Sequence, residues 1–111
     1  MDIPVFNGYF AAILRSKRVA ASLTQAELAA RAGVTRRYIQ SIENGKQEAT
    51  LSTFFAIANA LSISPSQFLV DLEYALKNGV LPDHVGKYSQ PRKIGRPLKH
   101  PEFQNFNGEG K

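Results

Sequence analysis

The sequence predicts an all-α fold, with a compact five-helix domain over residues 1–78 and an extended tail over residues 79–111. Apolar residues recur at helical spacing through the first segment, and nowhere in it do they alternate with the period of two that a strand requires. Four of the six prolines follow Gly79, and prolines at that density exclude a long helix. The chain therefore divides into one helical domain and one proline-containing tail.

The first helix is predicted over about residues 6–21, from apolar side chains at helical spacing: Phe10, Ile13, Leu14 and Ala21. The second helix begins at a capping box, in which Thr24 and Glu27 each satisfy a backbone N–H that lacks a partner inside the helix. It ends at Gly33, because glycine readily adopts the left-handed conformation that closes a helix.

The third helix is expected to begin at Thr35, a good N-cap residue, and to reach Asn44 before Gly45 closes it. Thr50 caps the fourth helix, which has a broad apolar face formed by Leu51, Phe54, Phe55, Ala58 and Leu61.

The fifth helix is expected to begin at Ser64, with Pro65 at its first helical position, and to end at Gly79. One of its sides is lined by apolar residues: Phe68, Leu69, Leu72 and Leu76.

The chain carries a formal net charge of +5, of which +2 falls on residues 1–78 and +3 on the shorter segment 79–111. Such a basic balance indicates an acidic partner, most often nucleic acid. The absence of cysteine excludes disulfides and thiolate metal sites, and it fits a reducing compartment. Residues 1–18 lack the charge order of a signal peptide, and the longest apolar run, residues 9–14, is too short to span a bilayer. We therefore expect a soluble cytoplasmic protein with no membrane partner.

No enzymatic function is expected. The only histidines, His84 and His100, fall in the predicted tail, and no Ser/His/Asp grouping lies on a predicted helix. No glycine-rich phosphate loop is present. We therefore expect no catalytic residue, no metal, no cofactor and no small-molecule effector, and we interpret Asp83 and His84 as a solvent-exposed turn.

The second and third helices, joined by a short turn that contains Gly33, have the arrangement of a helix-turn-helix. At about 100° per residue, the third helix has an apolar face and, opposite it, a polar face formed by Arg36, Arg37, Gln40 and Ser41. Arginine can bond both acceptors of guanine, glutamine can pair with adenine, and the first residues of such a helix reach the bases. The alternative is a solvated basic face on a structural helix. The agreement of both helices with the turn favours a DNA-reading face.

The segment TQAELAARAGVTRRYIQSIENGK, residues 24–46, resembles the DNA-binding domain of the Cro and phage-repressor (XRE-type) helix-turn-helix family. The similarity covers about residues 9–73, and it includes SKR before this segment and LSTFFAIANALSIS and PSQFL after it. It implies a lambda-repressor-like five-helix domain that binds double-stranded DNA, with the helix-turn-helix at the second and third helices. It also implies a nucleoid-associated protein of prokaryotic, phage or plasmid context.

The resemblance also implies roles for single residues. Base-contacting positions, taken together with the polar face above, are Thr35, Arg36, Arg37, Gln40 and Ser41. Positions that contact the sugar-phosphate backbone are Gln25, Asn44 and Lys46. Arg18 and Glu43 match a structural ion pair that ties the first helix to the end of the third. Two positions depart from the family pattern: Glu48 puts a negative charge in a loop near phosphate, and Ser62 replaces a helix-ending glycine.

Residues 91–99, PRKIGRPLK, resemble an AT-hook, in which a Gly-Arg-Pro core with basic flanks lies in the minor groove of A·T-rich DNA. Ile94 departs from the hook pattern, which has arginine there. The candidate minor-groove arm consists of Arg92, Lys93, Gly95, Arg96 and Lys99. The alternatives are a solvated basic tail and an arm packed within an oligomer, and the aromatic residues of the tail favour some packing.

These features together indicate a sequence-specific transcriptional regulator, most simply a repressor, which reads a two-fold-related operator as a homodimer with its third helix in the major groove. The fifth helix is the expected dimer surface, although Phe68 and Leu69 are expected to complete the core of the monomer. The alternative is an antitoxin or a co-activator-like protein-interaction module, which would bind DNA weakly, without sequence preference and with steep salt dependence.

Overall fold

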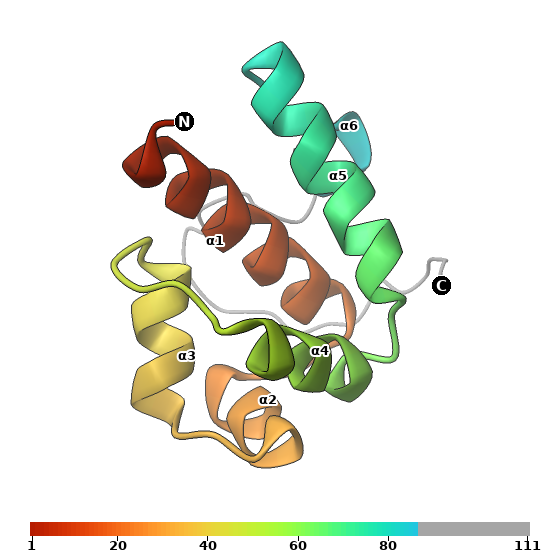
Figure 1. Ribbon diagram of the computed structural model, residues 1–111. Coiled ribbons are helices and arrows are strands. Elements are labelled where there is room, and N and C mark those ends of the chain that lie inside the picture. Colours follow the sequence, from red (N-terminus) through yellow and green to blue (C-terminus); the bar gives the residue numbers. More distant parts are fainter. Residues whose placement is uncertain (87–111) are drawn as a thin grey trace.

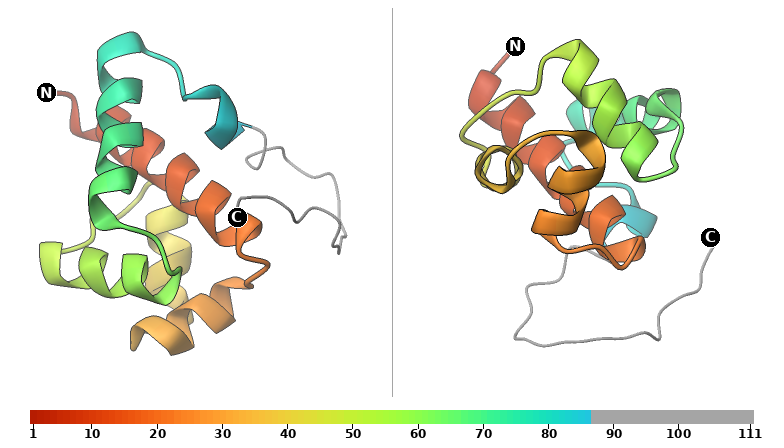
Figure 2. Two further views of the ribbon diagram at one scale, coloured as in Figure 1. Left: turned by 90° about the vertical axis from the view of Figure 1, so that its right-hand side faces the viewer. Right: turned by 90° about the horizontal axis from the view of Figure 1, so that it is seen from below.

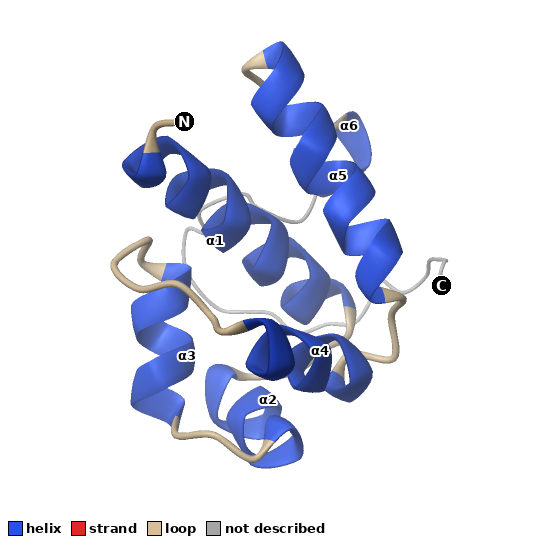
Figure 3. Cartoon of the chain, viewed as in Figure 1, coloured by secondary structure: helices blue, strands red, loops and turns tan. Residues whose placement is uncertain are grey.

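The structure is a computed structural model of the chain, and it describes residues 1–86. Within this range every regular element is a helix (Figure 3). In chain order the helices are α1 (Ile3–Ala20), α2 (Gln25–Ala32), α3 (Arg36–Glu43), α4 (Leu51–Ala60), α5 (Pro65–Asn78) and α6 (Asp83–Gly86). The predicted all-α class is confirmed, and a sixth, short helix is added to the five that were expected.

Helix α1 runs through the middle of the molecule, and the other helices surround it (Figure 1). Helices α3 and α6 lie on opposite sides of α1, and α5 packs along it (Figures 1 and 2). Helices α2 and α4 pack on each other near the C-terminal end of α1. Every element that could present a functional face is therefore positioned directly or indirectly by α1.

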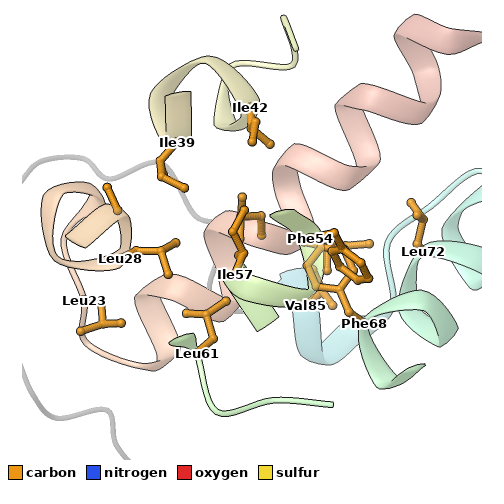
Figure 4. Packing of buried hydrophobic residues seen from close by; sticks show 13 residues of the cluster. Leu23, Leu28, Ile39, Ile42, Phe54, Ile57, Leu61, Phe68, Leu72 and Val85 are labelled. Carbon is orange, nitrogen blue, oxygen red and sulfur yellow. The ribbon is translucent and has the colours of Figure 1, made fainter. Parts of the chain in front are cut away.

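The core is apolar and receives side chains from all six helices, among them Ile13, Leu28, Ile39, Phe54, Phe68 and Val85 (Figure 4). Three phenylalanine rings join α1, α4 and α5. The ring centroid of Phe68 lies 4.9 Å from that of Phe10 and 5.0 Å from that of Phe54. Aromatic pairs at this spacing add to the stabilisation that burial alone provides.

The helix ends follow the local sequence. The predicted capping box is present, because Thr24 Oγ1 accepts from the N–H of Glu27 at 3.0 Å and Glu27 Oε1 accepts from the N–H of Thr24 at 2.8 Å. Helix α1 begins at Ile3, earlier than the predicted residue 6, because Asp2 accepts from the N–H of Val5 and Pro4 suits the first turn. Ser62 adopts a φ of +58°, so the position where the family has glycine does require the left-handed conformation.

The apolar faces of α4 and α5 are only partly buried. Leu69 was expected in the core, but it is 44% exposed, because it lies about 100° round α5 from the buried Phe68. Leu51 and Phe55 were placed on the apolar face of α4, and both are exposed, whereas Phe54, Ile57 and Ala58 point inward. The exposed side chains leave an apolar surface on α4 and α5.

Residues beyond position 78, where the predicted helical domain ends, also contribute to the core. Residues 81–86 fold back so that α6 packs on α1, and Val85 is completely buried in the core. The hydroxyl of Ser16 donates to the carbonyl oxygen of Val85 at 2.9 Å. The sequence pattern missed this return because four residues are too few to show a helical period.

None of the described helices is by itself long and apolar enough to cross a membrane; α4 and α5 meet that criterion only as a pair bent by 111°, and only by length and composition.

The return of residues 81–86 predicts different costs for two valine substitutions. Val85→Ala should lower the free energy of unfolding by about 1.5–3 kcal/mol, because it removes fully buried methyl groups and leaves a cavity. Val80→Ala, at a position that is 56% exposed, should change it by less than about 0.5 kcal/mol. Urea unfolding followed by circular dichroism measures both, and equal small effects would contradict the burial of α6.

Candidate nucleic-acid interface

Helices α2 and α3 are joined by residues 33–35, and the turn between them is defined by backbone geometry. Gly33 has a φ of +75°, and the N–H of Val34 donates to the carbonyl oxygen of Ala29 at 3.0 Å. Thr35 then caps α3, since its Oγ1 accepts from the N–H of Tyr38 at 3.1 Å. The chain thus forms the helix-turn-helix that the sequence predicted.

Helix α3 has one face in the core and one face in solvent. Ile39 and Ile42 are buried, while Arg36, Arg37 and Gln40 are exposed. Ser41 is only partly exposed, so it lies at the edge of the polar face. The first turn of α3 contains no acidic residue, and a helix N-terminus is itself electropositive. The exposed start of α3 therefore presents two guanidinium groups on a surface suited to an anion.

Thr35, predicted both as the N-cap of this helix and as a base-contacting residue, keeps a free hydrogen-bond donor after it caps α3. Because its hydroxyl oxygen already accepts a hydrogen bond from the helix backbone, the O–H is left as a donor. A donor at the helix start can bind a phosphate oxygen or an acceptor on a base edge.

The far end of α3 is fixed by a buried carboxylate. Arg18 donates to both oxygens of Glu43, from Nε to Oε2 at 2.7 Å and from Nη2 to Oε1 at 2.9 Å. A further Arg18 nitrogen, Nη1, donates to the carbonyl oxygen of Leu23 at 2.8 Å. The structure thus contains the ion pair that the family resemblance implied, and its side chains are largely shielded from water.

Gln25, at the first position of α2, also binds this carboxylate. Its Nε2 donates to Oε1 of Glu43 at 3.1 Å. One amide hydrogen and the amide oxygen remain for another partner. The start of α2 and the end of α3 are therefore joined through a single side chain, which also holds α1.

The loop after α3 provides two of the predicted backbone-contacting side chains. Asn44 and Lys46 are exposed, and Gly45 between them has a φ of +75°, which allows the chain to reverse. Glu48 is also exposed in this loop. One cation and one carboxylate thus share the segment beside α3.

The structure brings together a polar cluster that the sequence analysis did not identify. Asp71 of α5 is 2% exposed, and its carboxylate lies between Lys17 Nζ, 2.7 Å from Oδ2, and His84 Nε2, 3.0 Å from Oδ1. His84, interpreted from sequence as part of an exposed turn, has an exposed ring that nevertheless contacts this carboxylate. A signal was available, because residue 71 shares the inward face of α5 with Phe68, Leu72 and Ala75, where a carboxylate is unusual.

The candidate minor-groove arm, Arg92, Lys93, Gly95, Arg96 and Lys99, lies outside the described residues. Among residues 1–86, no group of three or more metal-ligating side chains is placed to hold a metal ion.

Comparison with known proteins gives matches in sequence. The Helix-turn-helix family model matches residues 14–68. The HTH-type transcriptional regulator y4dJ of Sinorhizobium fredii is 38% identical over 64 residues, which are 58% of this chain and 79% of that protein. A transcriptional regulator in the ATPase CF(0) region of Rhodospirillum rubrum is 38% identical over 60 residues, which are 54% of this chain and 56% of that protein.

Solved structures match the same region. The restriction-modification controller protein C.AhdI from Aeromonas hydrophila is 32% identical, with a TM-score of 0.55 over 56% of this chain and 94% of that one. The clp gene regulator ClgR from Corynebacterium glutamicum is 25% identical, with a TM-score of 0.60 over 64% of this chain and 92% of that one. Three of these proteins are named as regulators and one as a controller protein, which confirms the expectation of a regulator and not an enzyme.

The buried ion pair predicts a large stability effect at one position. Arg18→Met should lower the free energy of unfolding by about 3–5 kcal/mol, because the Glu43 carboxylate would stay buried without its cation. Lys77→Met is the control, since its contact with Glu73 at 4.0 Å is exposed, and it should cost less than about 0.5 kcal/mol. Urea unfolding at neutral pH gives both values. Similar small losses for the two variants would show that the Arg18 contact is not the anchor of α3.

Proposed function

Since the chain belongs to the Cro/C1-type (XRE) helix-turn-helix family of transcriptional regulators, we propose that it represses transcription by reading a two-fold-related operator as a homodimer, with α3 in the major groove. The observation that carries this proposal is the exposed polar face of α3, where Arg36, Arg37 and Gln40 stand free of the core. These residue types make the bidentate contacts that distinguish guanine and adenine.

The proposed contacts fall into two groups. Arg36, Arg37, Gln40 and, at the edges, Thr35 and Ser41 read base edges. Gln25, Asn44 and Lys46 bind the sugar-phosphate backbone and set the register, which carries no sequence information by itself. The carboxylate of Glu48 opposes phosphate binding, so the loop after α3 adds less affinity than an all-basic loop would.

The dimer surface that we propose differs from the one predicted from sequence. Phe68 and Leu72 are buried inside the monomer and cannot be shared with a partner. The apolar side chains that remain exposed on α4 and α5 are Leu51, Phe55, Leu69, Val70 and Tyr74. Leu51 and Leu69 also line one open groove of about 220 Å³, so the two helices contribute to one continuous surface. Exposed apolar patches of this kind mark interaction sites.

Two copies joined through this surface would present two α3 helices to one face of DNA. Half-sites about 34–36 Å apart, one helical turn, are the spacing that such dimers read. The basic segment with Arg92, Lys93, Gly95, Arg96 and Lys99 would add minor-groove contacts where the flanking DNA is A·T-rich.

Selection of bound sequences from a random duplex pool, with the full chain, tests this function first. We expect a palindromic consensus, and an A·T-rich flank if the arm binds the minor groove.

Arg37→Ala should lose about 1–3 kcal/mol of binding free energy on the selected site, and its preference for one base pair should become weaker. Lys46→Ala should weaken binding to all sequences alike. It should also reduce by about one the slope of the logarithm of the binding constant against the logarithm of the salt concentration.

Two outcomes would contradict the proposal in different ways. An unenriched pool, with weak and steeply salt-dependent binding, would favour the antitoxin or co-activator-like module. Unchanged affinity and unchanged base preference in Arg37→Ala would remove α3 as the reading helix while leaving DNA binding in place.

The dimer surface is tested by a matched pair of charge insertions. Val70 and Val80 are both 56% exposed, but only Val70 belongs to the proposed surface on α5. Val70→Asp should weaken self-association at least about tenfold in sedimentation equilibrium, because a carboxylate would be buried against an apolar partner. Val80→Asp should leave the association constant unchanged. Equal effects, or a monomeric wild-type chain, would place the dimer contact elsewhere or exclude it.

A further inference from the structure

Three consecutive residues of α1 bind three different elements. The Ser16 hydroxyl donates to the backbone of α6, Lys17 pairs with Asp71 of α5, and Arg18 pairs with Glu43 of α3. Successive residues of a helix point about 100° apart, so these three contacts spread around α1. One turn of α1 therefore holds the base-reading helix on one side and α5 with α6 on the others (Figures 1 and 2).

The contact with α5 is made by a carboxylate in an apolar setting. Asp71 lies on the inward face of α5 beside Phe68, Leu72 and Ala75, and it is 2% exposed. An aliphatic side chain could fill such a position without the desolvation that a buried charge requires. A buried pair is instead suited to fixing a register, because charge attraction restrains one particular position of the two helices.

Helix α6 contacts this pair through one side chain. His84 Nε2 lies 3.0 Å from Oδ1 of Asp71, whereas Lys17 contacts the other oxygen, Oδ2. The next residue, Val85, is fully buried in the core. The Lys17 ammonium lies 2.7 Å from Oδ2, and opposite charges at this distance attract each other. Exclusion of water strengthens such an attraction.

We propose that Asp71, acting through Lys17, is a positioning residue that sets the spacing between the two recognition helices of the dimer. This inference rests on the homodimer proposed above. The outer face of α5 carries the proposed dimer surface, including Val70 and Tyr74, while its inner face is held to α1 by Asp71. Helix α3 is in turn held to α1 by Arg18. The adjacent residues Lys17 and Arg18 of α1 thus connect the helix that carries the proposed dimer surface to the proposed recognition helix.

A second path connects α5 to α3 through α4 and α2. The core residues along its first steps, from α5 to α4 and from α4 to α2, are apolar, such as Phe54, Ile57 and Leu28. The Gln25–Glu43 hydrogen bond joins only its last step, from α2 to α3. Apolar helix packing tolerates small sliding movements, whereas a buried ion pair favours one arrangement. The Lys17–Asp71 contact can therefore restrain the position of α5 along α1.

The test uses the full chain and a series of operators that differ only in the distance between half-sites. Adding or removing one base pair rotates one half-site by about 35° and moves it by about 3.4 Å. The wild-type chain should prefer its best spacing over either neighbour by at least about tenfold. Asp71→Asn and Lys17→Met should each reduce that preference to less than about threefold, because α5 can then shift on α1.

The matched control is Glu73→Gln, which removes the same charge from the same helix but from an exposed pair. It should keep the wild-type spacing preference, even if affinity changes. His84→Ala leaves Lys17 and Asp71 in place and removes the ring that contacts Asp71. Its spacing preference should therefore fall between those of the wild-type chain and of Asp71→Asn. Circular dichroism verifies that each variant is folded at the assay temperature, and Lys17→Met and His84→Ala decide the question if Asp71→Asn unfolds.

A uniform loss of affinity at all spacings, with the tenfold preference retained in Lys17→Met and His84→Ala, would overturn the inference and leave only a structural role. A wild-type chain without any preferred spacing would instead overturn the proposed dimeric reading of DNA, and the positioning role with it. The two failures are distinguishable because the first requires a wild-type optimum and the second lacks one.

Discussion

The buried ion pair between Arg18 and Glu43 is the interaction on which the arrangement of the helix-turn-helix depends. It joins α1 to the last residue of α3, and the same carboxylate also accepts from Gln25 at the start of α2. Helix α3 has only eight residues, which is too short to be stable by itself. Its orientation therefore comes from this contact at one end, from the Thr35 cap at the other, and from the burial of Ile39 and Ile42 between them.

The same principle organises the rest of the domain around α1. The aromatic contacts of Phe10 and Phe68 and the Lys17–Asp71 pair attach α5, and Ser16 attaches α6. Because polar contacts need a defined geometry while apolar contacts mainly need burial, the core supplies the bulk of the stability and the ion pairs restrict how the helices are arranged. The polar face of α3 can then remain free of internal partners, which leaves its side chains available to a ligand.

The exposed apolar residues of α4 and α5 and the exposed cations of α3 lie on different helices of a small domain. The extents of the molecule are 37, 30 and 26 Å, so the surface proposed for self-association and the surface proposed for DNA lie within one small body. In the proposed homodimer, two copies would place their α3 helices one turn of DNA apart. The angles between the helices inside each copy would then affect which operator spacing is bound.

The all-α class, the helix caps and the two faces of α3 follow from the sequence, because they depend on residue spacing and on hydrogen bonds between residues close in the chain. The capping box of Thr24 and Glu27 and the burial of Ile39 and Ile42 are examples. Tertiary structure alone decided that Leu69 faces solvent, that residues 81–86 return to the core, and that Lys17, Asp71 and His84 meet. These features depend on contacts between residues far apart in the chain. The helical periodicity of a sequence identifies an apolar face, but it does not identify the element that packs against that face.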